Sequence, residues 1–192
     1  MKIETLFTSF IASETLSLDN SLLEEHCHDY VKENPADHSK FQSILIKNSK
    51  NTEYQKLEQE VLKNFNKLHF HYGLKDTYQQ IIKESWINID INDSICYPHI
   101  HPNCCFSAVY YVKAEESCGN LDFISPIQNH QYVMNHEFVN EYNEFTAFNR
   151  FIIPKKGLLL IFPSWLTHLV GTNNSKTERI SIAFNSSCVL TD

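Results

Sequence analysis

The sequence has no apolar run that could cross a membrane and no signal-peptide pattern at its N-terminus. A membrane helix needs about 18 or more apolar residues in succession. The sequence also has no run of lysine and arginine, and its net charge is −7. We therefore expect no membrane partner and no nucleic-acid partner. A small acidic ligand is still compatible with this charge, because it needs only one or two well-placed cations.

Paired cysteine spacing is also missing. The chain contains six cysteines but no CxxC pair, so it has neither a zinc-finger pattern nor the spacing of a disulfide framework. We interpret all six as reduced thiols, which is typical of a cytoplasmic protein. The cysteines are Cys27, Cys96, Cys104, Cys105, Cys118 and Cys188.

With 192 residues, of which 42% are hydrophobic, the chain can bury a sizeable core. This length predicts one domain spanning residues 1–192. Within residues 1–77, the alternating stretch IETLFTSFI predicts a strand, and apolar residues at helical spacing predict helices around 22–31 and 54–68. Most of the segment between these helices, residues 35–51, is expected to be loop.

Residues 78–192 change to short strands separated by turns, which predicts an α+β fold with a β-sandwich or barrel core. Residues 125–150 are polar and aromatic without a clear period. A loop of this length inside a compact domain is often a lid, so we expect one over the substrate.

The stretch CYPHIHPNCCFSAVYYV is the strongest indication of chemistry. His99 and His101 are two residues apart, so on an extended segment both side chains point the same way. A third ligand should come from a distant strand, and His168 in LLLIFPSWLTHLV is the best candidate. Three imidazoles suit iron, zinc, copper or nickel and leave coordination positions open for a substrate. The alternative is that these are surface and core histidines without a metal.

Arg179 opens the strand RISIAFN, in which Arg179, Ser181, Ala183 and Asn185 share one face. The opposite face is apolar, so the polar face should border a wet cavity. A guanidinium with a neighbouring hydroxyl can bind both oxygens of a carboxylate. The alternative is a surface arginine paired with Glu178 or Asp192. His69 and His71 form a rival histidine pair, although no apolar strand follows them. Trp165 could line the same cavity or belong to the core.

These motifs together resemble the Fe(II)/2-oxoglutarate oxygenases, nearest to the prolyl-hydroxylase-like branch. The resemblance covers residues 86–186, and the N-terminal helices also resemble a short, uncharacterised subfamily of these oxygenases. The matching motifs, in family order, are His99-x-His101, Tyr110-Tyr111-Val112, CGNLDF, Pro154-Lys155-Lys156-Gly157 to Phe162, His168 and Arg179-x-Ser181. The resemblance implies a double-stranded β-helix, of the jelly-roll or cupin-like kind, with N-terminal supporting helices.

The resemblance also implies roles for individual residues. His99 and His168 would be imidazole ligands of Fe(II), Arg179 would bind the far carboxylate of 2-oxoglutarate, Tyr110 would hydrogen-bond the same carboxylate, and Ser181 would support it. The implied cofactors are Fe(II), 2-oxoglutarate and O2, with ascorbate as an accessory reductant.

His101 departs from the family pattern, in which an Asp or Glu completes a site of two histidines and one carboxylate. His101 could be the third ligand, a nearby acid could replace it, or the site could be weakened and inactive. The candidate acids are Asp90, Asp93 and Asp122. A register with His101 first and Asn103 second is a further alternative.

Three functions remain open at this stage. The first is a dioxygenase that hydroxylates a C–H bond of a peptide, protein or amino-acid-like substrate, with release of succinate and CO2. The second is a cupin-like zinc or nickel protein with hydrolase or isomerase activity, which would leave Arg179 unexplained. The third is a binding module without catalysis. The sequence names no substrate, and it is compatible with a monomer or a homodimer.

Overall fold

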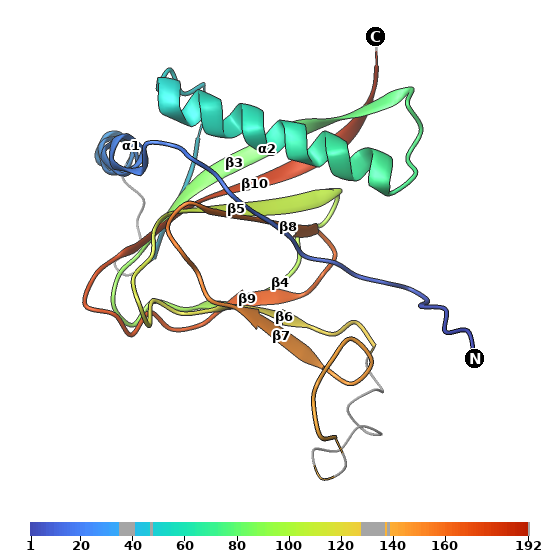
Figure 1. Ribbon diagram of the computed structural model, residues 1–192. Coiled ribbons are helices and arrows are strands. Elements are labelled where there is room, and N and C mark those ends of the chain that lie inside the picture. The colour runs from blue at the N-terminus through green and yellow to red at the C-terminus, as the bar shows by residue number, and fades with distance from the viewer. Residues whose placement is uncertain (35–40, 47, 128–136, 138, 192) are drawn as a thin grey trace.

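The computed structural model describes residues 1–34, 41–46, 48–127, 137 and 139–191. Two antiparallel sheets face each other, and two helices cover the outer face of the larger sheet (Figure 1). The elements are, in chain order, β1 (Ala12–Thr15), α1 (Asn20–Glu33), β2 (Phe41–Leu45), α2 (Thr52–His71), β3 (Tyr78–Asp90), β4 (Cys96–His99), β5 (Phe106–Lys113), β6 (Leu121–Ile124), β7 (Asn149–Ile152), β8 (Leu158–Pro163), β9 (His168–Val170) and β10 (Arg179–Leu190).

The larger sheet has the strand order β1-β8-β5-β10-β3-β2, and the smaller sheet has the order β4-β9-β6-β7. Strands distant in sequence therefore lie side by side, as when β10 pairs with both β3 and β5. This arrangement confirms the predicted α+β class with a double-stranded β-helix core and supporting helices.

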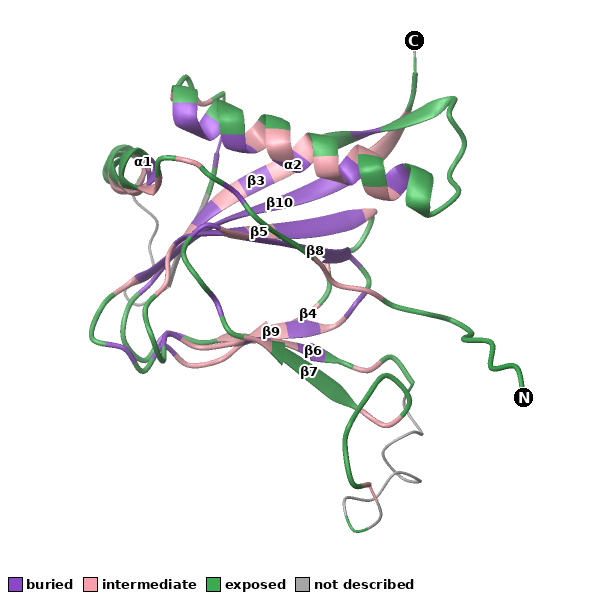
Figure 2. Cartoon of the chain, viewed as in Figure 1, coloured by how far each residue is buried: buried purple, intermediate pink, exposed green. Residues whose placement is uncertain are grey.

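Each helix begins at a side-chain cap. Asp19 caps α1 by accepting hydrogen bonds from the backbone N–H groups of Ser21 and Leu22. Asn51 caps α2 by accepting one from Tyr54. The apolar face of α2 then packs onto the larger sheet through Leu57, Val61 and Phe65, which are fully buried. Figure 2 shows this alternation along α2, with its buried side turned toward β3.

One expectation for the N-terminal part is wrong, and another is refined. The first strand lies at Ala12–Thr15 rather than in IETLFTSFI, because only residues 12–15 pair with β8. Ile3, Leu6 and Phe7 remain exposed instead. The segment expected to be mostly loop contains one short strand, β2, which pairs with β3 at the edge of the larger sheet. The two adjacent polar residues of that short strand, Gln42 and Ser43, make its sequence resemble a loop in composition.

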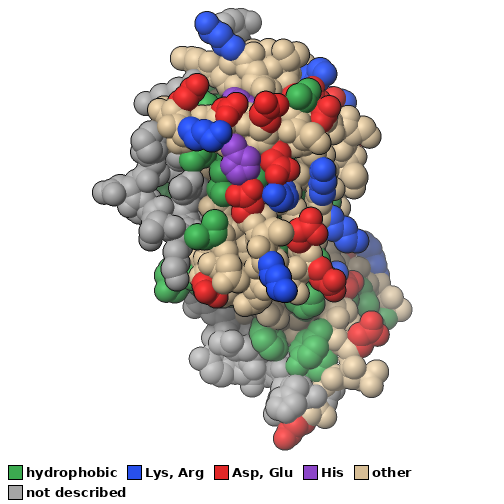
Figure 3. Space-filling view, turned by 90° about the vertical axis from the view of Figure 1, so that its left-hand side faces the viewer, with side chains coloured by type: hydrophobic (Ala, Val, Ile, Leu, Met, Phe, Trp, Pro, Cys, Tyr) green, Lys and Arg blue, Asp and Glu red, His purple; other side chains and the backbone are tan. Residues whose placement is uncertain are grey.

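Two surface findings bear on partners. None of the helices in the described part of the chain is long and apolar enough to cross a membrane. On the face shown in Figure 3, acidic and basic side chains are interspersed rather than gathered into one basic area. A nucleic acid is normally bound by a concentrated basic surface, and the described residues on this face do not form one.

Candidate metal centre and cofactor cavity

The two sheets enclose a cavity of about 310 Å³ between them. This size is at the small end of the range for ligand pockets, which is about 300–1,000 Å³. Its walls come from both sheets and include the three candidate histidines and Arg179. The complete lining is Trp86, Asn88, Asp90, Cys96, His99, His101, Ser107, Ala108, Val109, Tyr111, Leu121, Phe162, His168, Val170, Arg179, Ser181, Ala183 and Phe184.

His99, His101 and His168 meet inside this cavity. Their candidate ligand atoms all lie within 4.8 Å of one another. The register explains part of this, because β4 pairs with β9 so that His99 lies directly opposite His168. The centroids of these two rings are 4.4 Å apart, and His101 lies 5.0 Å from His99 and 5.2 Å from His168. Segments some 70 residues apart in sequence thus present three imidazoles to one point.

Backbone carbonyls fix the tautomer of two of these rings. Nδ1 of His99 lies 2.8 Å from the carbonyl oxygen of Tyr97, and Nδ1 of His168 lies 2.9 Å from that of Leu166. Only a protonated nitrogen can donate to a carbonyl, so each Nε2 keeps its lone pair for another partner. A carbonyl that orients a histidine in this way is a common support of metal-binding imidazoles.

His101 has a different partner. The amide nitrogen of Asn185 lies 3.3 Å from Nδ1 of His101 and donates to it. The same amide donates to Glu84 and accepts from Ser107, so a buried network holds its orientation. In this arrangement the proton of His101 is on Nε2. To ligate through Nε2, the ring must move that proton to Nδ1 and the Asn185 amide must turn its oxygen toward it.

The site keeps two of its histidines, His101 and His168, neutral. Burial, together with the neighbouring His99, lowers the pKa of His101 from 6.5 to about 4. Burial also lowers the pKa of His168 to about 4, against the hydrogen bond to Leu166. Neutral imidazole is the form that binds a metal ion, so protons do not compete for these two residues near pH 7.

We expect the metal-free protein to lose stability in acid. Because the unfolded histidines have a pKa near 6.5, the unfolded chain binds more protons than the folded chain between about pH 6.5 and 4. The free energy of unfolding should therefore fall as the pH falls through this window. Urea denaturation at pH 7, 5.5 and 4.5 measures this, and His101→Gln should make the fall shallower. Equal slopes for the variant and the wild type would contradict this explanation.

The acids considered as alternative ligands lie elsewhere. Among the described residues, the histidine group includes no carboxylate. Asp90 is 2% exposed and forms a salt bridge with Arg179. Asp93 is exposed in the turn after β3. Asp122 of β6 pairs with Leu169 of β9, which is the residue after His168. In the rival pair, His69 is buried and hydrogen-bonds Lys75 and Gln80, whereas His71 is exposed.

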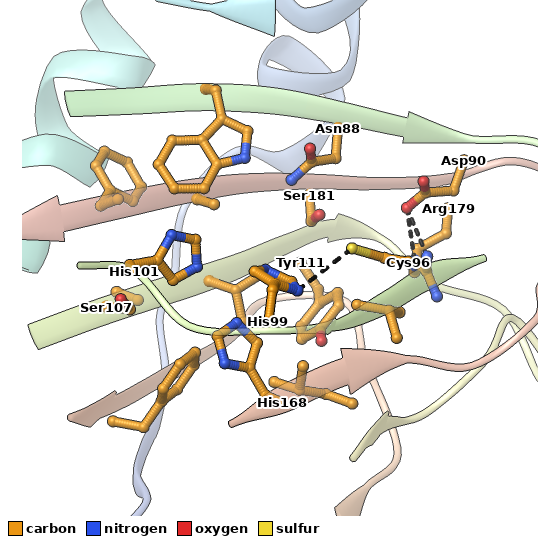
Figure 4. Close-up of a pocket in the computed structure, with 18 residues that line it drawn as sticks. Asn88, Asp90, Cys96, His99, His101, Ser107, Tyr111, His168, Arg179 and Ser181 are labelled. Carbon is orange, nitrogen blue, oxygen red and sulfur yellow. Dashed lines mark hydrogen bonds and ion pairs between the residues drawn. The ribbon is translucent and has the colours of Figure 1, made fainter. Parts of the chain in front are cut away.

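Arg179 lines the cavity as expected, but it is neither free nor on the surface. Its Nε and Nη2 donate to Oδ2 of Asp90 over 3.0 and 2.6 Å, and its Nη1 donates to the carbonyl oxygen of Cys118 over 2.6 Å. Figure 4 shows this pair at one end of the cavity, His101 at the other, and Cys96 between them. Gly119 permits the close approach of the loop, because a Cβ there would lie 2.9 Å from Nη1 of Arg179.

The structure corrects the expectation for Tyr110. Tyr110 points away from the cavity into the core beneath the helices, where its hydroxyl donates to Asn20 over 2.9 Å. The next residue, Tyr111, lines the cavity instead. Successive residues of a strand point to opposite faces, so Ser107, Val109 and Tyr111 share the cavity face. The alternation in FSAVYYV was the pattern that could have identified Tyr111.

Other expectations for the cavity wall have mixed outcomes. Ser181 and Ala183 face the cavity with Arg179, as the alternation in RISIAFN predicts. Trp165 is 47% exposed and lies outside the lining, whereas Trp86 of β3 forms part of it. The predicted lid over 125–150 falls partly outside the described residues, which omit 128–136 and 138.

Comparison with known proteins agrees with this site. A family model described as "Putative 2OG-Fe(II) oxygenase" matches residues 84–185, which is just over half of the chain and includes all three histidines and Arg179. A search of curated proteins finds no match.

Several solved structures have a similar fold. A prolyl-4-hydroxylase from Pseudomonas putida is 16% identical, with a TM-score of 0.63, and 94% of each chain is covered. The α-ketoglutarate-dependent carbocyclase SnoK from nogalamycin biosynthesis is 10% identical, with a TM-score of 0.65 over 92% of this chain and 78% of its own. HygX from Streptomyces hygroscopicus, solved with nickel and 2-oxoglutarate bound, is 9% identical, with a TM-score of 0.61 over 93% and 82%. At these identities the likeness shows the fold.

Proposed function

The chain belongs to the 2OG-Fe(II) oxygenase family, and from this premise we propose that it hydroxylates a C–H bond of a peptide, protein or amino-acid-like substrate. The family assignment makes it an enzyme of the Fe(II)- and 2-oxoglutarate-dependent class. One observation supports the proposal most strongly. Three imidazoles that lie within 4.8 Å of one another share a small cavity with a buried guanidinium. A metal and a small dicarboxylate require these two groups at separate ends of one cavity.

The residues present fit both cofactors. Two of the three histidines have a pKa near 4 and are therefore neutral ligands at pH 7. At the other end, buried oxygen atoms of Asn88 and Asp90 have no hydrogen-bond partner among the described residues. An unpaired buried polar atom costs about 1–3 kcal/mol, so such atoms in a cavity wall favour a bound polar ligand.

We propose that His99, His168 and His101 bind the iron. Nε2 of His99 and of His168 is free of a proton, whereas His101 must first move its proton from Nε2 to Nδ1. Arg179, Ser181 and Tyr111 line the far part of the cavity, where the distal carboxylate of 2-oxoglutarate would lie. When bound, iron and 2-oxoglutarate supply the oxidation, in which O2 is consumed and succinate and CO2 are released. The chain itself positions the reactants and excludes water, through apolar walls that include Leu121, Phe162 and Val170.

We also propose a reducing compartment such as the cytoplasm. All six cysteines are free in the structure, and free thiols in this number are typical of proteins kept reduced. Thiol titration of protein extracted under conditions that trap its native redox state tests this. Disulfides in the trapped protein would contradict it.

Anaerobic titration tests the proposed activity directly. The protein with Fe(II) should develop a weak visible charge-transfer band when 2-oxoglutarate is added, and admission of O2 should release succinate. Mass spectrometry of candidate peptides would then locate an added oxygen. If the protein binds Fe(II) but neither binds nor consumes 2-oxoglutarate, the proposal fails and the cupin-like metal protein becomes the better explanation.

We expect Tyr111→Phe to weaken 2-oxoglutarate binding by about tenfold or more without affecting Fe(II) binding. The variant removes one hydroxyl from the cavity wall, and a hydrogen bond to a charged group is worth about 1.5–3 kcal/mol. Tyr110→Phe is a matched control, because the hydroxyl of Tyr110 bonds Asn20 outside the cavity. Calorimetric titration with both variants measures the difference. An equal loss in both variants would show that Tyr111 has no direct role.

A further inference from the structure

The salt bridge at the far end of the cavity changes what this end can bind. Asp90 and Arg179 are each 2% exposed, and two hydrogen bonds join them over 2.6 and 3.0 Å. Asp90 comes from the end of β3, and Arg179 comes from the start of β10, directly opposite in the register. The positive charge that a dicarboxylate would seek is therefore already matched by a carboxylate of the protein.

At this end of the cavity, two buried acceptor atoms have no hydrogen-bond donor among the described residues. Both hydrogen bonds between Arg179 and Asp90 go to Oδ2 of Asp90, and Oδ1 of Asp90 has no partner among the described residues. The same holds for Oδ1 of Asn88, two residues earlier on the same face of β3. Guanidinium has five N–H donors, and those of Arg179 not used by Asp90 or by the carbonyl oxygens of Cys118 and Gly119 remain for a ligand. The end thus offers donors and a carboxylate oxygen side by side.

Asp90 is the anionic group at this end of the cavity. Burial raises the pKa values of Tyr111 on β5, Cys96 on β4 and Cys118 in the loop before β6, so these three groups are neutral at pH 7. Burial also raises the pKa of Asp90, and Arg179 opposes this by stabilising the ionised form. One buried cation and one buried anion make this end neutral before any ligand enters.

A second carboxylate at this end would leave a buried net negative charge. Two carboxylates that share one site cannot both ionise readily, and the pKa of one is strongly raised. A proton held between them removes the repulsion and gives Oδ1 of Asp90 the donor that it lacks. The remaining oxygen of the ligand can then accept from Arg179.

We propose that Asp90 is a specificity-determining residue that makes the cavity bind 2-oxoglutarate together with one proton, shared between its distal carboxylate and Oδ1 of Asp90. This inference rests on the proposed function of the cavity. Its consequence is that the affinity for 2-oxoglutarate is proton-linked. Because the bound state holds one proton more than the free reactants, the dissociation constant should rise about tenfold per pH unit above neutrality.

Anaerobic calorimetry with the Fe(II)-loaded protein tests the proposal. Titration of 2-oxoglutarate in buffers of different ionisation enthalpy, at pH 7 and 8, counts the protons taken up per ligand. We expect about one proton for the wild type. We expect none for Asp90→Asn, in which the amide can donate to the ligand, and an affinity at pH 8 at least tenfold higher than that of the wild type. 2-Oxopentanoate, which lacks the distal carboxylate, should bind without proton uptake.

Asp93→Asn is the matched control, because it removes a carboxylate three residues away that is exposed to solvent. It should behave as the wild type does. Binding of 2-oxoglutarate to the wild type without proton uptake, or with equal uptake in Asp90→Asn, would overturn the role of Asp90 and leave the proposed function intact. Failure of all three proteins to bind either oxo acid while they bind Fe(II) would instead count against the proposed function.

Discussion

Replacing His168 by alanine should weaken Fe(II) binding by more than about 100-fold. Loss of a residue that only orients a metal ligand already lowers metal affinity by about 10–100-fold, and His168 is a candidate ligand itself. His168 is 4% exposed, and its Nδ1 is held by the carbonyl oxygen of Leu166, so its Nε2 is fixed toward the other two rings. The alanine variant removes one of three converging ligands and leaves an incomplete site. Anaerobic Fe(II) titration, with circular dichroism as a check on folding, measures the effect.

Three further variants make this prediction specific. His99→Ala removes a less buried ligand and should cause a similar loss, which guards against a folding defect in His168→Ala. His101→Ala should cause a smaller loss, because His101 must shift its proton and turn Asn185 before it can ligate. His71→Ala changes an exposed histidine at the end of α2 and should have no effect. Wild-type affinity for Fe(II) in both His99→Ala and His168→Ala would contradict the proposed metal site.

Alternation along strands made much of the fold and the cavity predictable. Arg179, Ser181 and Ala183 were placed on one face of a strand by a period of two, and all three line the cavity. The apolar spacing of α2 predicted its buried face in the same way. These patterns are local, so they can be read without knowing which strands become neighbours.

The partners of these residues could not be predicted in this way. The salt bridge between Arg179 and Asp90 depends on the register of β10 against β3, which joins positions 89 residues apart. The same register places Asp90 against Arg179, so Asp90 is not part of the histidine group. The resemblance to the family predicts Tyr110, whereas alternation along β5 predicts Tyr111, which is the residue that lines the cavity. The N-terminal strand was misplaced because pairing with β8, not composition, determines where it forms.

Replacing Arg179 by methionine should lower the free energy of unfolding by about 3–5 kcal/mol, because a buried carboxylate is left without its partner. Asp90 is 2% exposed and cannot easily recover hydration inside the cavity. The variant should also lose measurable 2-oxoglutarate binding while its affinity for Fe(II) is unchanged, since the guanidinium makes no contact with the histidines in the hydrogen-bond network. Urea denaturation and calorimetry measure the two effects separately.

The double variant Asp90→Asn, Arg179→Met separates the two roles of Arg179. Removal of both charges leaves no unpaired buried ion, so the double variant should regain a large part of the lost stability. It should not regain 2-oxoglutarate binding, because the cation that the distal carboxylate needs is still missing. Recovery of stability without recovery of binding would identify Arg179 as both a structural ion-pair partner and a ligand-binding group. A double variant no more stable than Arg179→Met alone would show that lost packing, rather than the unpaired charge of Asp90, causes the instability.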